Sequence, residues 1–301
     1  MPTVRDDFVD RTNEIELLNS ALHDQSLEKD SIVFVYGQSG IGKTQLLARF
    51  LRICRFNDIS IVYVDLPDKD YLGLIDKIEE ELGPDGFQTL ESAYDDVILR
   101  SQMVRGQVSL PGLHEQQLTN QDTSTQGFVF HKEVSAETQY FVNGSVTFKN
   151  PKITNVYNLV FSEPEPVKDL SERKITQAFY QCLRTLTQEK TIAILLDHWE
   201  GANDAFKTWL KNHLIQWASE LSLKNGLVVL CREEFPTEFE HQTGILALAL
   251  PEFTREIALE YWMKSGLRED EFNGIDMELC RLPKILALEI DRRRAMSRGK
   301  Q

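Results

Sequence analysis

The sequence has little cysteine and no long apolar run. Its four cysteines lie far apart, so the CxxC spacing of a zinc or redox site does not occur, and its six histidines do not cluster. We therefore expect free thiols and no metal site built from histidine and cysteine. An apolar run of about 18 residues is missing, and residues 1–10 lack the apolar core of a signal peptide. These absences predict a cytoplasmic protein with no membrane partner.

Basic residues are also scarce. The chain has 33 Lys and Arg against 47 Asp and Glu, a formal net charge of −14. Because phosphate backbones repel an acidic chain, we expect no nucleic acid partner. Hydrophobic residues make up 42% and charged residues 27% of the chain, which is typical of a globular protein and excludes a disordered or collagen-like one. A length of 301 residues favours about two domains.

Apolar runs alternate with amphipathic stretches along most of the chain. We expect buried strands at 31–36, 59–64, 191–196, 226–231 and 245–250. We expect helices at 11–25, 72–82, 171–188, 204–223, 254–265 and 283–296. One more helix is expected to follow the glycines after the first strand and to end at about residue 55. This order predicts an α/β fold, a parallel sheet flanked by helices, with a small C-terminal helical lid.

The alternation breaks between residues 86 and 165, where Gln, Thr, Asn and Ser are frequent. Three stretches resemble strands, and Asn143-Gly144 is typical of a hairpin turn; the stretches are Gly127–Lys132, Gln139–Lys149 and Lys152–Phe161. We therefore expect a β-rich insertion whose polar, nearly neutral composition suits a protein partner or self-association. The expected organisation is a nucleotide-binding domain at 1–85 and 166–251, the insertion at 86–165 and the lid at 252–301.

The strongest motif is Gly37-Gln-Ser-Gly-Ile-Gly-Lys43-Thr44, which matches GxxxxGK[ST]. It follows an expected strand and opens an expected helix, as in a phosphate-binding P-loop. Its glycines let backbone N–H groups converge on phosphate oxygens, Lys43 reaches the β- and γ-phosphates, and the Thr44 hydroxyl ligates Mg²⁺. The motif predicts a site for ATP or ADP with Mg²⁺. The candidate binding residues are Gly37, Ser39, Gly40, Ile41, Gly42, Lys43, Thr44 and Gln45.

An acidic residue, Asp197, ends the apolar run 192–196. In a P-loop protein such a carboxylate holds Mg²⁺, usually through water, although the same pattern also fits a strand followed by a helix cap. His198 comes next, where many AAA-type ATPases have Glu. Because neutral imidazole polarises water less well than a carboxylate does, we expect slow ATP hydrolysis or none.

Two further residues complete the candidate catalytic set. Glu200 lies three residues after Asp197 and either reaches the site or is a solvated acid in the first turn of a helix. Arg232 ends the strand at 226–231 and either contacts the γ-phosphate or pairs with a neighbouring glutamate. The candidate catalytic residues are Asp197, Glu200 and Arg232, and the candidate metal ligands are Thr44 and Asp197.

In their order along the chain, these motifs resemble those of STAND ATPases, the signal-transduction P-loop NTPases that include NB-ARC and NACHT proteins. The segment Phe8–Leu17 resembles the hh-Gly-Arg-x-x-E segment that cups the adenine, which implies that Val9 and Arg11 bind the nucleotide. Asp197-His-Trp-Glu resembles the Asp-Asp-x-Trp form of the second motif, and Cys231-Arg232 resembles the Thr-Ser-Arg sensor.

The resemblance continues in the C-terminal part of the chain. Leu246–Pro251, followed by Thr254–Ala258, resembles the family's strand–helix junction. Arg281-Leu-Pro283-Lys284 and the residues after it resemble the Gly-Leu-Pro-Leu-Ala-Leu segment of the lid, which implies that Pro283 approaches the adenine. The likeness covers residues 7–82 and 170–296. The chain departs from the family pattern at Asp10 and Arg281, which replace Gly, and at His198, which replaces an acid.

The resemblance implies a regulatory switch in which ATP and ADP favour different lid positions and so control oligomerisation or partner engagement. Two alternatives remain. One is an active AAA-type motor or loader, which rapid ATP turnover would distinguish. The other is a structural interaction module in which a nucleotide is held permanently, which a failure to exchange would distinguish.

Overall fold

The computed structural model describes most of the chain and divides it into two units. One unit comprises Met1–Leu90 and Thr176–Gln301, and the other comprises Glu91–Ile175. The described residues are 11–24, 30–67, 69–104, 149–162, 165–221 and 225–298.

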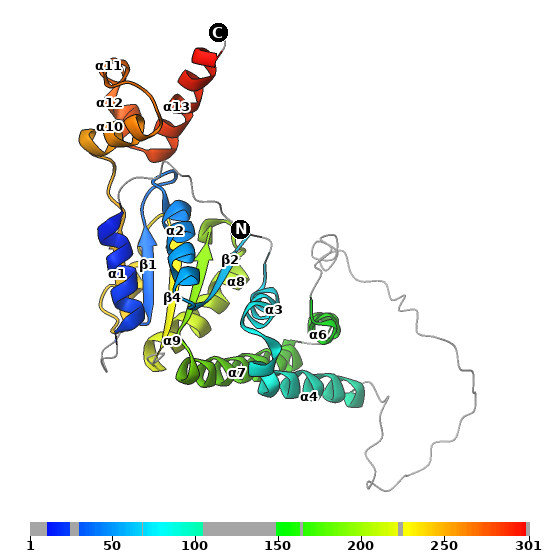
Figure 1. Cartoon of the computed structure of the whole chain (residues 1–301). Coiled ribbons are helices and arrows are strands. Elements are labelled where there is room, and N and C mark those ends of the chain that lie inside the picture. Colours follow the sequence, from blue (N-terminus) through cyan, green and yellow to red (C-terminus); the bar gives the residue numbers. More distant parts are fainter. Residues whose placement is uncertain are drawn as a thin grey trace, which may run out of the picture. The chain divides into compact units, whose positions relative to one another are not determined.

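A five-stranded sheet lies at the centre of the first unit (Figure 1). The strands run in the order β2-β3-β4-β1-β5, and every neighbouring pair is parallel. The inner strands are almost wholly buried, which explains their continuous apolar sequences. The prediction of a parallel α/β sheet is therefore confirmed. The strands are β1 (Ile32–Tyr36), β2 (Ser60–Asp65), β3 (Ile192–Asp197), β4 (Gly226–Arg232) and β5 (Ile245–Ala249).

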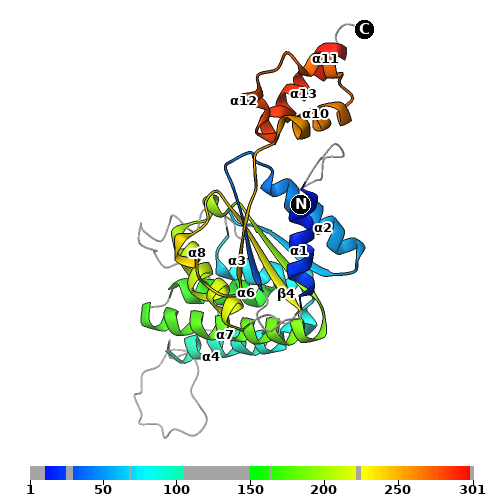
Figure 2. The ribbon, with the colours of Figure 1, turned by 90° about the vertical axis from the view of Figure 1, so that its left-hand side faces the viewer.

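Helices cover both faces of this sheet (Figure 2). On one face, α1 (Thr12–His23) and α2 (Lys43–Phe56) share a buried apolar core with the strands, to which Leu18 and Phe50 contribute. On the other face, α3 (Tyr71–Leu82) packs on β2. Further elements are the turn η1 (Pro84–Phe87), α7 (Glu165–Glu189), η2 (Trp199–Gly201), α8 (Asp204–Trp209), the π-helical turn η3 (Leu210–Ile215), α9 (Gln216–Leu221) and η4 (Thr237–Phe239).

The second unit is helical where the structure describes it. Helix α4 (Gln88–Val104) and helix α6 (Pro151–Ser162) lie within the region expected to be rich in strands. The prediction of a strand at Lys152–Phe161 is wrong, because Ile153, Val156 and Val160 recur at helical spacing and are all buried. The described part of 86–165 contains no strand. The expected strand Gly127–Lys132 and the turn at Asn143-Gly144 lie outside the described residues, as does nearly all of Gln139–Lys149.

The C-terminal helices have an apolar core of their own. Trp262 is fully buried there, and its indole N–H donates to the carbonyl oxygen of Arg268 at 2.8 Å. We call residues 252–298 the lid. Its helices are α10 (Arg255–Lys264), α11 (Glu269–Phe272), α12 (Met277–Cys280) and α13 (Pro283–Arg298), and its buried core includes Phe253, Tyr261, Trp262, Phe272, Leu286 and Ile290.

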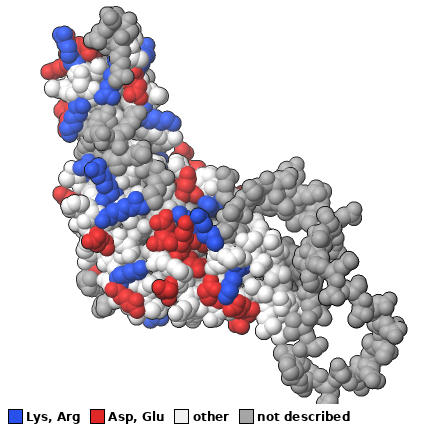
Figure 3. All heavy atoms as spheres, turned by 45° about the vertical axis from the view of Figure 1, so that its right-hand side comes forward, with Lys and Arg blue, Asp and Glu red and all other residues white. Residues whose placement is uncertain are grey.

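The surface carries both signs of charge. Acidic side chains gather at the middle of the face in Figure 3, with Lys and Arg side chains beside them. The net negative charge is therefore not spread evenly over this face. Among the described helices, none is long and apolar enough to cross a membrane.

Candidate functional site

The P-loop connects the end of β1 to the start of α2. Gly40 and Gly42 have positive φ angles of 86° and 102°, which glycine adopts without strain. The ammonium group of Lys43 folds back on the loop and donates to the carbonyl oxygens of Gly37 at 2.5 Å and Gln38 at 3.2 Å. The side chain of Lys43 is thereby held over the loop.

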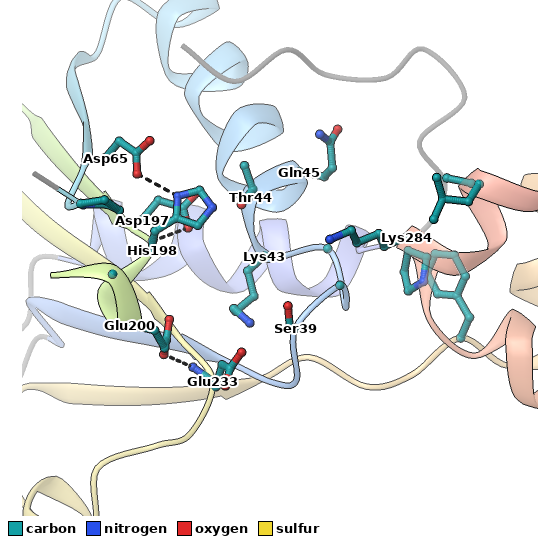
Figure 4. A pocket seen from close by; sticks show the side chains of 18 of the residues that line it. Ser39, Lys43, Thr44, Gln45, Asp65, Asp197, His198, Glu200, Glu233 and Lys284 are labelled. Carbon is teal, nitrogen blue, oxygen red and sulfur yellow. Dashed lines mark hydrogen bonds and ion pairs between the residues drawn. The ribbon is translucent and has the colours of Figure 1, made fainter. Parts of the chain in front are cut away.

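A cavity of about 840 Å³ opens above the P-loop (Figure 4). This volume is in the range of small-ligand sites. Residues from the P-loop, from the ends of β2, β3 and β4, and from the lid contribute to its wall. They are Ser39, Gly40, Gly42, Lys43, Thr44, Gln45, Asp65, Pro67, Asp197, His198, Glu200, Gly201, Glu233, Phe253, Tyr261, Pro283, Lys284, Ala287 and Leu288.

Asp197 is buried at the end of β3, and two donors hold its carboxylate. One oxygen, Oδ1, accepts from the backbone N–H of His198 at 2.9 Å, and Oδ2 accepts from the hydroxyl of Tyr63 at 3.0 Å. Burial and the neighbouring Asp197 raise the pKa of Tyr63 well above its usual range, so this hydroxyl stays protonated at neutral pH. Each carboxylate oxygen retains a lone pair for a further partner.

A second carboxylate lies beside Asp197. Strands β2 and β3 pair Asp65 with Asp197, so both strands end in an acid at the same edge of the sheet. His198 has a left-handed backbone (φ 57°, ψ 47°), and its Nδ1 lies 2.8 Å from Asp65 Oδ1 and 3.7 Å from Asp197 Oδ2 (Figure 4). Sequence reasoning missed Asp65, although an apolar run ending in an acid was the signal that found Asp197.

Glu200 lines the cavity and also joins two elements. Its Oε1 accepts from the backbone N–H of Glu233 at 2.6 Å, just after β4. The carbonyl oxygen of Glu233 in turn accepts from the N–H of Gly37 at 3.1 Å. The carboxylate of Glu200 therefore connects η2 through Glu233 to the first residue of the P-loop.

Arg232 does not line the cavity. Its guanidinium carbon lies 5.4 Å from the ring centre of Trp199. Its Nε and Nη1 are buried and have no hydrogen-bond partner among the described residues, and burial lowers the pKa of the guanidinium. Of the three candidate catalytic residues, the structure thus brings Asp197 and Glu200 to the cavity and places Arg232 against Trp199.

Arg11 lies behind the P-loop rather than in the cavity. It is buried, and its Nη2 donates to the carbonyl oxygens of Pro251 at 2.7 Å and Ile41 at 3.3 Å. Its Nη1 pairs with Glu14 at 3.1 Å, and its guanidinium lies 5.5 Å from the ring centre of Phe253. Arg11 therefore links α1, the P-loop and the start of the lid. The other residue of this segment, Val9, is outside the described residues.

The lid contacts the P-loop through the first turn of α13. The backbone N–H of Lys284 donates to the carbonyl oxygen of Gly40 at 3.2 Å. A Cβ built on Gly40 would lie 3.1 Å from Cβ of Lys284, and one built on Gly42 would lie 3.9 Å from Pro283. Outside α13, Gln38 donates to Glu252 at 2.6 Å. This close contact, together with the positive φ of Gly40, favours glycine at position 40.

Lys284 was not expected at the site. Figure 4 shows its ammonium group pointing from the lid into the cavity above the P-loop. Within the described part of the chain, no hydrogen bond or ion pair holds this group. The lid segment that this part of the chain resembles has Leu at this position, so the positive charge of Lys284 is a departure from that segment.

The residues present fit a nucleotide and Mg²⁺. Thr44 and Asp197 bring a hydroxyl and a carboxylate to the same cavity, and oxygen ligands are those that Mg²⁺ prefers. Lys43 and Lys284 bring positive charge to the P-loop, while Phe253 and Leu288 bring apolar surface to the lid side. A charged triphosphate and a flat apolar base need this combination.

Comparison with known proteins identifies a family and finds matching solved structures. A family model described as "AAA ATPase domain" matches residues 7–236, and no curated protein matches the chain. One solved structure that matches is described as a Signal Transduction ATPase with Numerous Domains (STAND) protein with a tetratricopeptide repeat sensor, from Pyrococcus horikoshii. The TM-score is 0.47 at 14% identity, over 96% of this chain and 30% of that chain. The chain thus spans less than a third of the length of that protein.

Proposed function

The chain belongs to the AAA ATPase domain family, and on this premise we propose that it is a regulatory switch of STAND type. In this proposal it binds ATP or ADP with Mg²⁺ in the cavity above the P-loop. Hydrolysis is slow, and the state of the nucleotide controls oligomerisation or the engagement of a protein partner. The second unit and the rest of residues 86–165 are the proposed partner surface.

One observation carries the proposal: the same cavity is lined by the phosphate-binding loop and by the first turn of the lid helix α13. A nucleotide there would contact both parts of the chain at once. A ligand shifts a conformational equilibrium only through a difference in its contacts with the two states. Because ATP and ADP differ in phosphate number and charge, they would differ in their contacts with Lys284 and so in the lid position that they favour.

Each residue has a distinct part in binding. Mg²⁺, when bound, neutralises phosphate charge and is held by Thr44 and by Asp197, which Tyr63 and the His198 amide keep in place. Lys43 exchanges its contacts with the loop carbonyls for contacts with phosphate. The side chains of Tyr261 and Leu288 cover the base from the lid side.

The test begins with the nucleotide content of the freshly purified protein. Acid extraction and chromatography should find ADP or ATP at about one per chain in the wild type and none in Lys43→Ala, since Lys43 is the main phosphate-binding cation. The control variant is Lys264→Ala, because Lys264 lies on the lid surface and pairs with Glu260 rather than with the cavity.

The next step separates the switch from its alternatives. Exchange of bound ADP for added ATP, with a change in the distance between labels on α2 and α13, would support the switch. A nucleotide that resists exchange would favour the structural module, and turnover of several per second would favour a motor. Failure of the wild type to contain or bind nucleotide with Mg²⁺ would contradict the proposal.

A further inference from the structure

The residue after Asp197 is not a carboxylate, so another residue must orient the water that attacks ATP. Hydrolysis of ATP needs a group that orients the attacking water, and a carboxylate does this well. This chain has His198 directly after Asp197. The carboxylates that line the cavity are those of Asp65, Asp197, Glu200 and Glu233.

The contacts of these four acids differ. Asp197 is buried, already accepts two hydrogen bonds and is the proposed metal ligand. Glu200 accepts the backbone N–H of Glu233 at 2.6 Å, a contact that supports the start of the P-loop. The side chain of Asp65 is 58% exposed, and His198 is its one partner in the described part of the chain.

We infer that Asp65 is the catalytic carboxylate that orients water for ATP hydrolysis in this chain, and that His198 is a positioning residue that restrains it. The inference rests on the proposed nucleotide site. Figure 4 shows Asp65 and His198 on the side of the cavity where Thr44 and Asp197, the proposed metal ligands, are found. Glu233 lies instead beside Glu200, on the side of Lys43.

The register of the sheet supports this assignment. Asp65 is directly opposite Asp197 on the neighbouring strand, so a short side chain at 65 reaches the region next to the metal-binding carboxylate. The acid of this site thus comes from the end of β2 instead of from the residue after Asp197. The N–H of Leu66 donates to the carbonyl oxygen of Asp197 at 3.1 Å, which keeps the two strand ends together beyond the sheet.

The reaction step itself is simple. The water that Asp65 orients forms a bond from its oxygen to the γ-phosphorus, and the bond from that phosphorus to the bridging oxygen breaks. The electron pair of the broken bond stays with ADP. One proton of the water remains on inorganic phosphate and the other passes to solvent.

His198 limits this step in the structure described. Its Nδ1 contact with Asp65, at 2.8 Å, takes one lone pair of Oδ1 and holds the carboxylate toward the end of β3, so the carboxylate is less free to turn toward a water. The left-handed backbone at His198 fixes the start of this side chain at the end of β3. Slow turnover then follows from the Asp65–His198 contact, and removal of the imidazole should increase the rate.

The experiment measures phosphate release and the affinity for a fluorescent ATP analogue with Mg²⁺. Asp65→Asn should lower kcat by about a hundredfold, in the range of general acid–base groups, with affinity changed by less than about threefold. His198→Gly, which tolerates the positive φ, should raise kcat several-fold. The double variant should be as slow as Asp65→Asn, because the gain depends on Asp65.

The matched control is Asp58→Asn. Asp58 is exposed outside the cavity, and its φ of 55° suits asparagine, so kcat should stay at the wild-type value. The inference is overturned if Asp65→Asn keeps the wild-type rate, if the double variant keeps the gain of His198→Gly, or if only Glu233→Gln abolishes turnover. It is also overturned if neither the wild type nor His198→Gly hydrolyses ATP. If the wild type does not bind the ATP analogue at all, the result contradicts the proposed function itself, and this inference with it.

Discussion

Lys284 shows what a single side chain adds to this site. Its aliphatic carbons pack against Gly40, while its ammonium group points into the cavity. Lys43 and Lys284 both line the cavity and bring positive charge to it. Two cations that face the same space repel each other, and an anionic ligand between them removes this repulsion. The contribution of Lys284 to nucleotide affinity should therefore increase with the phosphate charge of the nucleotide.

We predict that Lys284→Met weakens ATP binding by about tenfold or more, the usual effect of losing one charge-assisted hydrogen bond. Methionine preserves the packing on Gly40, so adenosine binding should change little. Calorimetric titration with ATP, ADP and adenosine measures the three affinities. Lys264→Met serves as the control because Lys264 is on the lid surface. An equal loss of affinity for adenosine would show that Lys284 acts through packing instead of charge.

At the scale of the elements, Arg11 joins three parts of the chain that are distant in sequence. It lies just before α1, and it donates to Ile41 in the P-loop and to Pro251 just before the lid. The contact with Ile41 is buried and the contact with Pro251 is partly buried, and a buried polar group left unpaired costs about 1–3 kcal/mol. A side chain that does not line the cavity therefore joins the P-loop to the start of the lid.

We expect Arg11→Ala to lower the free energy of unfolding by about 2–4 kcal/mol, since Glu14 and two carbonyl groups lose their donor. Denaturant unfolding followed by tryptophan fluorescence measures this change. Arg11→Lys should restore only part of it, because an ammonium group lacks the planar fork that reaches several acceptors. Arg52→Ala, on the exposed side of α2, should be neutral. A neutral Arg11→Ala would mean that these contacts do not stabilise the fold.

At the scale of the whole molecule, the nucleotide should act as a stabilising link between the sheet and the lid. Each has its own apolar core, and the P-loop contacts with α13 join them. A ligand that binds only the folded state stabilises it according to its concentration relative to Kd. A ligand that contacts both parts should also make them unfold together.

We predict that MgADP or MgATP at a hundredfold excess over Kd adds about 2.7 kcal/mol of stability and raises Tm by a few degrees. Differential scanning calorimetry measures the shift, and chelation of Mg²⁺ should reduce it. Lys43→Ala should show no shift at the same concentrations. A similar rise in Tm for Lys43→Ala would mean that the nucleotide binds outside the P-loop.

Local sequence determined most of the framework. The five strands appear where continuous apolar runs predicted them. For β1, β3 and β4 the reason is burial on both faces, which admits few polar residues, whereas β2 and β5 are edge strands and are partly exposed. The P-loop was recognisable because its glycines, lysine and threonine act within one short turn. The segment that forms α6 was predicted to be a strand, because a short apolar run fits both the helical and the strand periodicity and only its packing distinguishes them.

The tertiary structure alone decided which distant residues meet. Pairing of β2 with β3 puts Asp65 beside Asp197, and the strand register that does this cannot be read from either segment alone. Packing also turned Arg232 onto Trp199 and brought Lys284 against Gly40. The sequence by itself therefore determined the strands, the phosphate loop and the family. The composition of the cavity depended on contacts between segments far apart in the chain, which local periodicity does not encode.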